Sequence, residues 1–197
     1  MQDNRLRAKD LITIAIFGVL FFAVYFICAI PTGISIVLYL FCVGISMIPC
    51  GVIWSYLRAK VPKRFAVLIQ GILMTIIVFI VGSGWFVAFG VLAGTILAEV
   101  SAGVGKYKSF KWNVVGYAAF AVCLNLGLFA IILLMRDYYY DFCIASGMDA
   151  AYMESLLNFM SGPLLLLTSV LSAVGAIIGM LLGKVLLKKH FVKAGIV

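Results

Sequence analysis

Residues 162–190 read GPLLLLTSVLSAVGAIIGMLLGKVLLKKH. No charged residue precedes Lys184 in this stretch, and about 20 predominantly apolar residues are enough for a helix to cross the hydrocarbon core of a bilayer. The stretch ends in a cluster of basic residues, which membrane proteins keep on the cytoplasmic side. The sequence therefore predicts a membrane-spanning helix over about residues 162–187 whose C-terminal end faces the cytoplasm.

The rest of the chain repeats this pattern of apolar segments and basic stretches. Every Lys and Arg except Arg136 lies in one of four short stretches, namely residues 5–9, 58–64, 106–111 and 184–193. Each basic stretch marks a return to the cytoplasm, so we expect an even number of spans and two cytoplasmic termini. Residues 1–197 are then a single all-α membrane domain, a six-transmembrane-helix bundle. Its predicted spans cover about residues 10–30, 34–56, 65–81, 85–102, 112–135 and 162–187.

Composition supports this class and argues against several others. Of the 197 residues, 65% are hydrophobic and 11% are charged, as in a polytopic membrane protein. The net charge of +8 is explained by the cytoplasmic loops and their attraction to anionic lipid, so no nucleic-acid partner is expected. The single histidine, His190, and five cysteines without metal-binding spacing predict neither enzymatic activity nor a metal or cofactor.

Small residues recur at helical spacing in three of the predicted spans. Such faces let two helix backbones approach closely in lipid. They indicate either packing within the bundle or a docking face for another membrane subunit, and the sequence leaves both open. The stripe at residues 90, 94 and 98 belongs to the helix over 85–102. The predicted partner-docking residues are Ala15 and Gly18, on roughly one face of the first helix, and Gly175, Gly179 and Gly183 on the last.

The outer side holds the candidates for ligand binding. Aromatic residues follow the turn at residues 82–84, and the segment between the last two spans is rich in Tyr and acidic residues. Residues 149–160 of that segment are predicted to form a short surface helix. A shallow aromatic pocket with a few polar groups suits a small, partly apolar ligand, although Trp and Tyr also gather at membrane interfaces without any ligand. The predicted substrate-binding residues are Trp85, Phe86, Asn125, Arg136, Tyr138 and Asn158.

Glu99 lies near the cytoplasmic end of its predicted helix. Ionisable residues within membrane spans are costly and are often functional. A structural pair with a Lys or Arg of the basic loops would explain this carboxylate, and so would a role in proton coupling. Both alternatives remain open at this point.

Several stretches resemble the Trep-Strep family of small bacterial integral membrane proteins, and the resemblance extends over essentially the whole chain. Members of that family are regarded as candidate substrate-binding (S) components of energy-coupling factor (ECF) transporters. The stretches that carry the resemblance are Lys9-Asp10-Leu11-Ile12-Thr13, Gly82-Ser83-Gly84-Trp85, residues 107–117, the Arg136-Asp137-Tyr138 loop with Ser146-Gly147-Met148, and the tail over residues 186–196.

The resemblance implies a six-helix S component in a bacterial cell membrane that captures a vitamin-like micronutrient on the outer side. It also implies a transmembrane coupling protein and two cytoplasmic ATPases as partners. S components of this class often dock through an Ala-xxx-Ala pattern on the first helix, from which Ala15 and Gly18 depart because they are three residues apart. The alternatives are a self-sufficient proton-coupled secondary transporter and a membrane adaptor that transports nothing.

Overall fold

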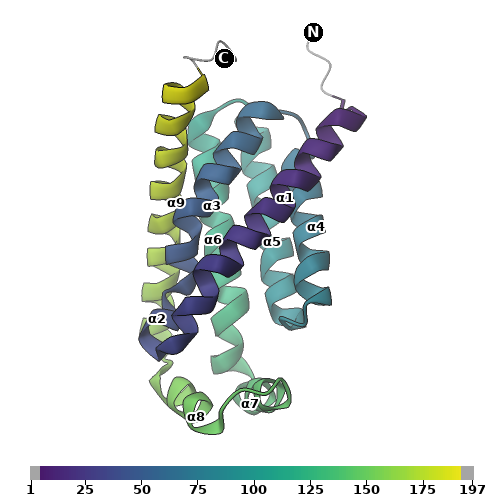
Figure 1. Ribbon diagram of the computed structural model, residues 1–197. Coiled ribbons are helices and arrows are strands. Elements are labelled where there is room, and N and C mark those ends of the chain that lie inside the picture. Colours follow the sequence, from purple (N-terminus) through teal and green to yellow (C-terminus); the bar gives the residue numbers. More distant parts are fainter. Residues whose placement is uncertain (1–4, 192–197) are drawn as a thin grey trace.

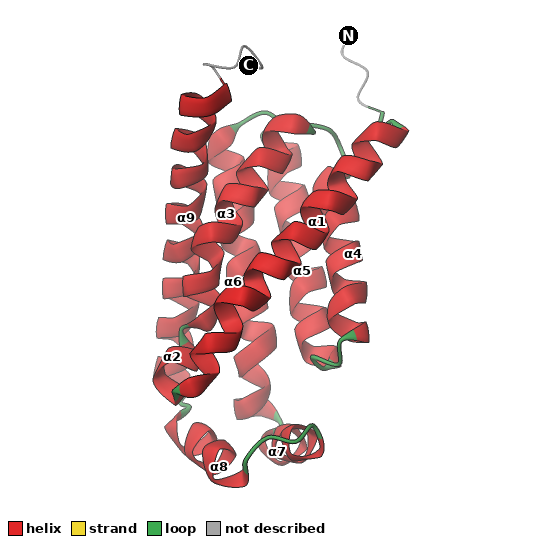
Figure 2. Cartoon of the chain, viewed as in Figure 1, coloured by secondary structure: helices red, strands yellow, loops and turns green. Residues whose placement is uncertain are grey.

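The computed structural model describes residues 5–191, with side chains as far as Lys188. The described part of the chain is helical and contains no strand (Figure 2), as the sequence predicts. Its helices are α1 (Ala8–Ala29), the 3-10 helix η1 (Ile30–Ile34), α2 (Ile36–Leu40), α3 (Cys42–Lys60), α4 (Ala66–Ile80), α5 (Trp85–Val104), α6 (Phe110–Leu134), α7 (Arg136–Ala145), α8 (Ala150–Phe159) and α9 (Gly162–Phe191).

Five of these helices, α1, α3, α5, α6 and α9, are long and apolar enough to cross a membrane. The sixth predicted span corresponds to α4, which is apolar but has only 15 residues. At about 1.5 Å per residue it is roughly 22 Å long. The structure therefore contains five long candidate spans and one shorter apolar helix.

The second predicted helix, over residues 34–56, is wrong in its outer part. The chain there forms η1 and α2, and the long helix α3 begins only at Cys42. Pro31 fixes its own backbone φ and lacks an N–H donor, and Ser35 is extended (φ −136°, ψ 133°). These two residues break the apolar run into short pieces at the outer edge.

The two ends of the bundle differ in charge. Figure 1 places the start of α1, the α3–α4 and α5–α6 connections and the end of α9 at one end, with η1, α2, α7 and α8 at the other. The described residues of the basic stretches fall at the first end, which we call the cytoplasmic end. There the Nζ atom of Lys63 lies 2.6 Å from a carboxylate oxygen of Asp10, so the α3–α4 connection is tied to the start of α1.

The glycine stripe of α9 packs against α3 inside the bundle. A Cβ atom on Gly179 would lie 2.6 Å from the carbonyl oxygen of Met47, and one on Gly183 would lie 2.6 Å from the Cβ of Ser55. A Cβ on Gly175 would collide with the carbonyl oxygen of Gly44. The stripe therefore serves intramolecular packing, and the prediction that it docks a partner is corrected because α3 already covers it.

The other two small-residue faces also have intramolecular roles. On α5, a Cβ on Gly90 would lie 2.6 Å from the carbonyl oxygen of Cys123 in α6. On α1, Gly18 is buried against α4, where an added Cβ would lie 3.2 Å from Leu73. Ala15, by contrast, is exposed. The expectation that Ala15 and Gly18 share one face is therefore wrong, since one faces outward and the other faces the bundle.

Candidate functional site

A cavity of about 440 Å³, which we call the outer cavity, is lined by residues of α1 to α7. Five of its lining residues are exposed, and all lie in segments at the outer end, namely Ile30, Gly33, Gly82, Ser146 and Met148. The cavity therefore opens on that side. Its aromatic lining residues are Phe21, Phe22, Tyr25, Phe26, Tyr39, Phe86, Tyr139 and Phe142.

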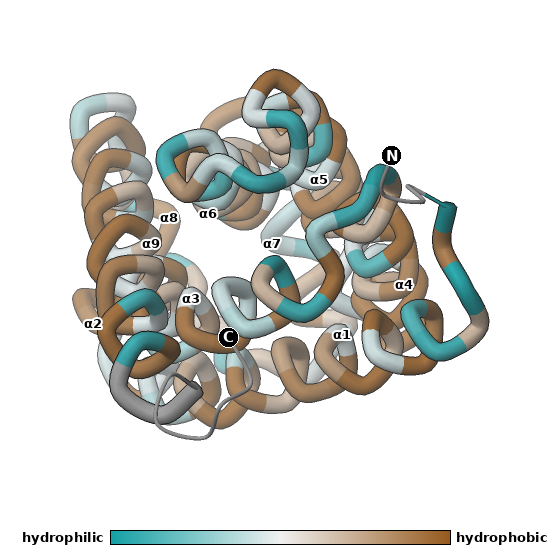
Figure 3. Tube along the Cα trace, turned by 90° about the horizontal axis from the view of Figure 1, so that it is seen from above, coloured by the Kyte–Doolittle hydropathy of each residue, from teal (hydrophilic) through white to brown (hydrophobic). Residues whose placement is uncertain are grey.

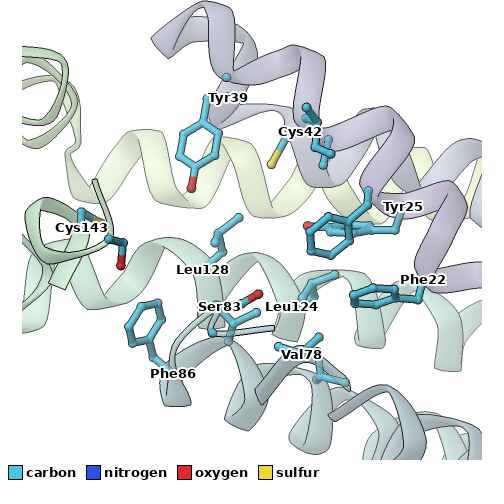
Figure 4. A pocket seen from close by; sticks show the side chains of 18 of the residues that line it. Phe22, Tyr25, Tyr39, Cys42, Val78, Ser83, Phe86, Leu124, Leu128 and Cys143 are labelled. Carbon is cyan, nitrogen blue, oxygen red and sulfur yellow. The ribbon is translucent and has the colours of Figure 1, made fainter. Parts of the chain in front are cut away.

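The lining of the outer cavity is uncharged. Figure 4 shows Tyr39 and Cys42 on one side of the cavity and Phe86 and Val78 on the other. No Asp, Glu, Lys, Arg or His is among the described residues that line it. Because a charge taken out of water without a partner is strongly unfavourable, this lining is better suited to an uncharged group than to a charged one. The polar groups that remain belong to Tyr25, Tyr39, Cys42, Ser83, Tyr139, Cys143 and Ser146.

The polar groups contributed by α7 stay protonated at neutral pH. Tyr139 and Cys143 are 2% and 4% exposed. Burial raises the pKa of Tyr139 well above its usual value, and the neighbouring Tyr39 and Cys143 raise it further. Burial also raises the pKa of the Cys143 thiol. Both side chains are therefore neutral hydrogen-bond donors rather than anions.

An aromatic layer closes the cavity toward the cytoplasmic end. The rings of Trp54 and Tyr117 lie 4.9 Å apart between centroids, and those of Trp54 and Phe120 lie 5.3 Å apart. Phe21, which lines the cavity, packs edge-on against all three. The Tyr117 hydroxyl donates to the carbonyl oxygen of Met47 at 3.0 Å, so its polar end is satisfied.

Of the predicted substrate-binding residues, Phe86 alone is among the residues that line the outer cavity. Its ring packs against Tyr139 and Phe142, at 5.7 and 5.5 Å between centroids. Trp85 lies beside it but is 40% exposed, and its indole N–H donates to the hydroxyl of Tyr138 at 2.8 Å. Trp85 and Tyr138 thus join α5 to α7 at the outer surface.

Arg136 and Asn158 also lie at the outer surface, away from the cavity lining. A guanidinium N–H of Arg136 donates to the side-chain oxygen of Asn158 at 2.6 Å. This hydrogen bond links the start of α7 to the end of α8. The predicted helix over 149–160 is confirmed as α8, which begins after Asp149, whose side chain accepts from the backbone N–H of Tyr152 at 2.8 Å.

Asn125 is fully buried and joins α6 to α9. Its amide nitrogen donates to the hydroxyls of Thr168 and Ser169 at 3.0 and 3.1 Å, and its oxygen accepts from Ser172 at 3.3 Å. Polar side chains of this kind hold helices together in membranes. The structure therefore gives Asn125 a packing role and leaves it outside the cavity lining.

Glu99 caps the start of α4. Its carboxylate oxygens accept from the backbone N–H groups of Phe65 at 2.7 Å and Leu68 at 3.3 Å. Backbone N–H groups at a helix N-terminus lack intrahelical partners and favour a negative charge. The carboxylate thus accepts hydrogen bonds from backbone amides, and it also interacts electrostatically with Arg58 of the basic stretch 58–64.

Sequence reasoning missed the residues that form the polar side of the cavity. Tyr25 and Cys42 lie within predicted spans and were not among the predicted substrate-binding residues, and Tyr39 lies in the part of the second predicted helix that is broken. Tyr139 is next to the predicted Tyr138 but points the other way, because successive helical residues face different directions. A tyrosine within an apolar run was the available signal, since its hydroxyl usually needs a partner.

Comparison with known proteins identifies the family. No curated protein and no solved structure matches the chain. Residues 8–193 match the family model described as "hypothetical bacterial integral membrane protein (Trep_Strep)". The match covers nearly all of the 197 residues, and the helices described above are those of a membrane protein with multiple candidate spans. The chain therefore belongs to the Trep_Strep family of bacterial integral membrane proteins.

Proposed function

We propose that this protein captures a small, uncharged, ring-containing nutrient in the outer cavity and acts as the S subunit of an ATP-driven, ECF-type importer. The observation that carries this proposal is the outer cavity itself. Its volume of about 440 Å³ is within the range of small-molecule sites, about 300–1,000 Å³. Its aromatic walls suit a planar ring, and its hydroxyl and thiol groups suit the few polar atoms of an uncharged ligand.

The surface of α1 supports docking to a transmembrane partner. Figure 1 shows α1 running diagonally across the bundle, where one side of it is covered. Its other side is apolar, and Ile12, Ile16 and Ile27 are each at least 60% exposed. Ala15 and Ala23 are exposed as well, and small residues on a helix surface permit close helix packing. A coupling protein that binds there, with two cytoplasmic ATPases, would supply the energy.

A second cavity favours one alternative, a self-sufficient secondary transporter. This cavity of about 350 Å³ lies at the cytoplasmic end, beyond Trp54 and Tyr117. Cavities at opposite ends of a bundle, separated by an aromatic layer, are an arrangement from which alternating access can develop. Glu99 is a poor proton carrier for such a transporter, because α4 backbone amides engage both of its oxygens.

Two measurements test the proposal. Native mass spectrometry of the full-length protein, purified from its own membrane, should detect one co-purifying uncharged small molecule. The same molecule should enter proteoliposomes only when the coupling protein, both ATPases and ATP are present. Uptake by this protein alone in ATP-free vesicles would support the secondary transporter instead. Failure of the purified protein to bind any small molecule would support an adaptor role.

A further inference from the structure

The cavity at the cytoplasmic end, which we call the inner cavity, lies between α3, α6 and α9. Figure 3, which looks onto this end, shows the backbones of these three helices. Three basic side chains line the inner cavity, those of Arg58, Lys108 and Lys184. No Asp or Glu is among its described lining residues. Its charge is therefore wholly positive.

Arg58 is the deepest of the three and is 4% exposed. Its guanidinium donates to the side-chain oxygen of Asn113 at 3.0 Å and to the carbonyl oxygens of Val61 and Tyr107 at 3.3 and 3.0 Å. All three acceptors are neutral. A guanidinium carries five N–H groups, so these bonds orient Arg58 while leaving other N–H groups for a ligand. A buried guanidinium carries a desolvation cost, which the nearby Glu99 carboxylate offsets in part, and a bound anion would offset it further.

The walls of the inner cavity are apolar. Met180 and Leu187 of α9 and Phe110 of α6 line it, and the ammonium group of Lys184 lies 4.7 Å from the centroid of the Phe110 ring. On α9, Leu181 and Val185 beside this wall are 49% and 62% exposed, as expected of side chains that face lipid tails. The basic groups of the inner cavity therefore lie next to a helix surface that faces the lipid tails.

The inner cavity is a consequence of helix packing, because α3, α6 and α9 are also joined to one another by other contacts. Hydrogen bonds of Asn125 hold α6 to α9 at the outer end. Gly183 packs on Ser55 and keeps α9 against α3. The inner cavity is lined by residues at the cytoplasmic ends of α6 and α9. The cavity is therefore bounded mainly by regular helices.

We propose that the inner cavity binds a phosphate group, carried by an anionic phospholipid of the inner leaflet, through Arg58 and Lys184. Arg pairs well with phosphate oxygens because its N–H groups form a fork. Basic pockets between helices at the cytoplasmic surface suit lipid head groups, and the apolar wall would accommodate the adjoining acyl chain. This inference does not depend on the proposed function, because the inner and outer cavities share no lining residue.

The test uses the full-length protein, delipidated in detergent and examined by native mass spectrometry. The probes are phosphatidylglycerol, phosphatidylcholine with the same acyl chains, and inorganic phosphate. Phosphatidylglycerol should bind at one saturable site, and Lys184→Gln should weaken it about tenfold. The control Lys60→Gln removes the same charge from an exposed residue outside the cavity lining and should leave binding within about twofold. Arg58→Lys keeps the charge but loses the fork, and should weaken binding if it folds.

The outcomes separate the sources of the phosphate group. Displacement of phosphatidylglycerol by millimolar inorganic phosphate, with the same Lys184 dependence, would support the phosphate site but assign it to a soluble ligand. Equal binding of phosphatidylcholine and phosphatidylglycerol would overturn the proposal. So would equal losses in Lys184→Gln and Lys60→Gln, because binding would then follow overall charge rather than this cavity.

Discussion

The outer and inner cavities of this bundle are similar in size, about 440 and 350 Å³, and opposite in chemistry. The outer cavity is lined by aromatic rings, phenols and thiols without a charged side chain among the described residues, whereas the inner cavity gathers three basic side chains. The aromatic layer that includes Trp54 and Tyr117 stands between them. Because electrostatic interactions are strong in a low-dielectric interior, this separation lets one bundle offer a neutral site and an anion site.

The comparison also shows what the basic residues contribute beyond topology. Arg58, Lys108 and Lys184 belong to the stretches that mark the cytoplasmic side, and the same three line the inner cavity. The outer cavity has no such source of charge, because the outer side carries few basic residues. The positions of the basic stretches therefore account for both the orientation of the bundle in the membrane and the difference in basic charge between the two cavities. The predictions below test how independent the two cavities are.

The largest effect is expected from the packing of α9 against α3. Gly179→Val should lower the free energy of unfolding by about 3 kcal/mol, because its side chain would meet the backbone of α3 at Met47 and Gly51. Thermal unfolding in detergent measures this change. Gly33→Ala is the matched control, since no heavy atom lies within 4 Å of an added Cβ there. Equal stability of the two variants would show that the α3–α9 contact is loose.

The next effect should be confined to the outer cavity. Val91 lines that cavity and is 1% exposed, so Val91→Phe should reduce the space for the ligand and weaken its binding at least about tenfold. Phosphatidylglycerol binding at the inner cavity should stay unchanged. Val100→Phe on the same helix, where the side chain is 60% exposed, provides the control. Native mass spectrometry follows both ligands, and parallel losses of both would show that the cavities are coupled.

The third test uses pH. Burial raises the pKa of Tyr139 and of Cys143, so binding of a neutral ligand in the outer cavity should not change between about pH 7 and 9. Unfolding lets Cys143 ionise near its ordinary pKa of about 8.5. Burial of the neutral Cys143 thiol therefore makes its full contribution to the free energy of unfolding below about pH 8.5, and this contribution declines at higher pH. Cys143→Ser should lessen the decline seen in thermal unfolding, and an unchanged decline would contradict a buried, neutral thiol.

The smallest effect should come from the exposed aromatic pair beside the outer cavity. Trp85→Phe removes the hydrogen bond to Tyr138, and an exposed bond of this kind contributes about 0.5–1 kcal/mol. Ligand binding should change less than about twofold, whereas Phe86→Ala removes a ring that lines the cavity and should weaken binding more. Isothermal titration of both variants compares them. The reverse order would restore Trp85 as a substrate-binding residue.

Local signals in the sequence predicted most of the fold. The length of the apolar runs and the positions of the basic stretches located the long helices, and the turn at residues 82–84 marked the start of α5. Spacing identified the glycine stripe of α9 but not its partner, because Gly51 of α3 lies far away in the sequence. The break at Phe41 carries no such signal. It ends a five-residue helix within a continuous apolar run.

The candidate site was harder to predict because it is assembled from distant segments. Phe86 was found through its place after a turn, but Tyr25, Tyr39 and Tyr139 come from three different helices. Asn125 shows the converse difficulty. A polar residue in a span indicates an important contact without saying whether its partner is a ligand or a neighbouring helix, and here its partners are hydroxyls of α9.

The short helix α4 has a further consequence for the surrounding lipid. A helix of 15 residues is about 8 Å too short for a hydrocarbon core about 30 Å thick. Its outer tip carries Phe79 and Ile80, which are 65% and 75% exposed and belong in an apolar medium. The bilayer relieves such hydrophobic mismatch by thinning locally. Thinning of the membrane beside Gly82, at the rim of the outer cavity, would bring the aqueous phase closer to that cavity.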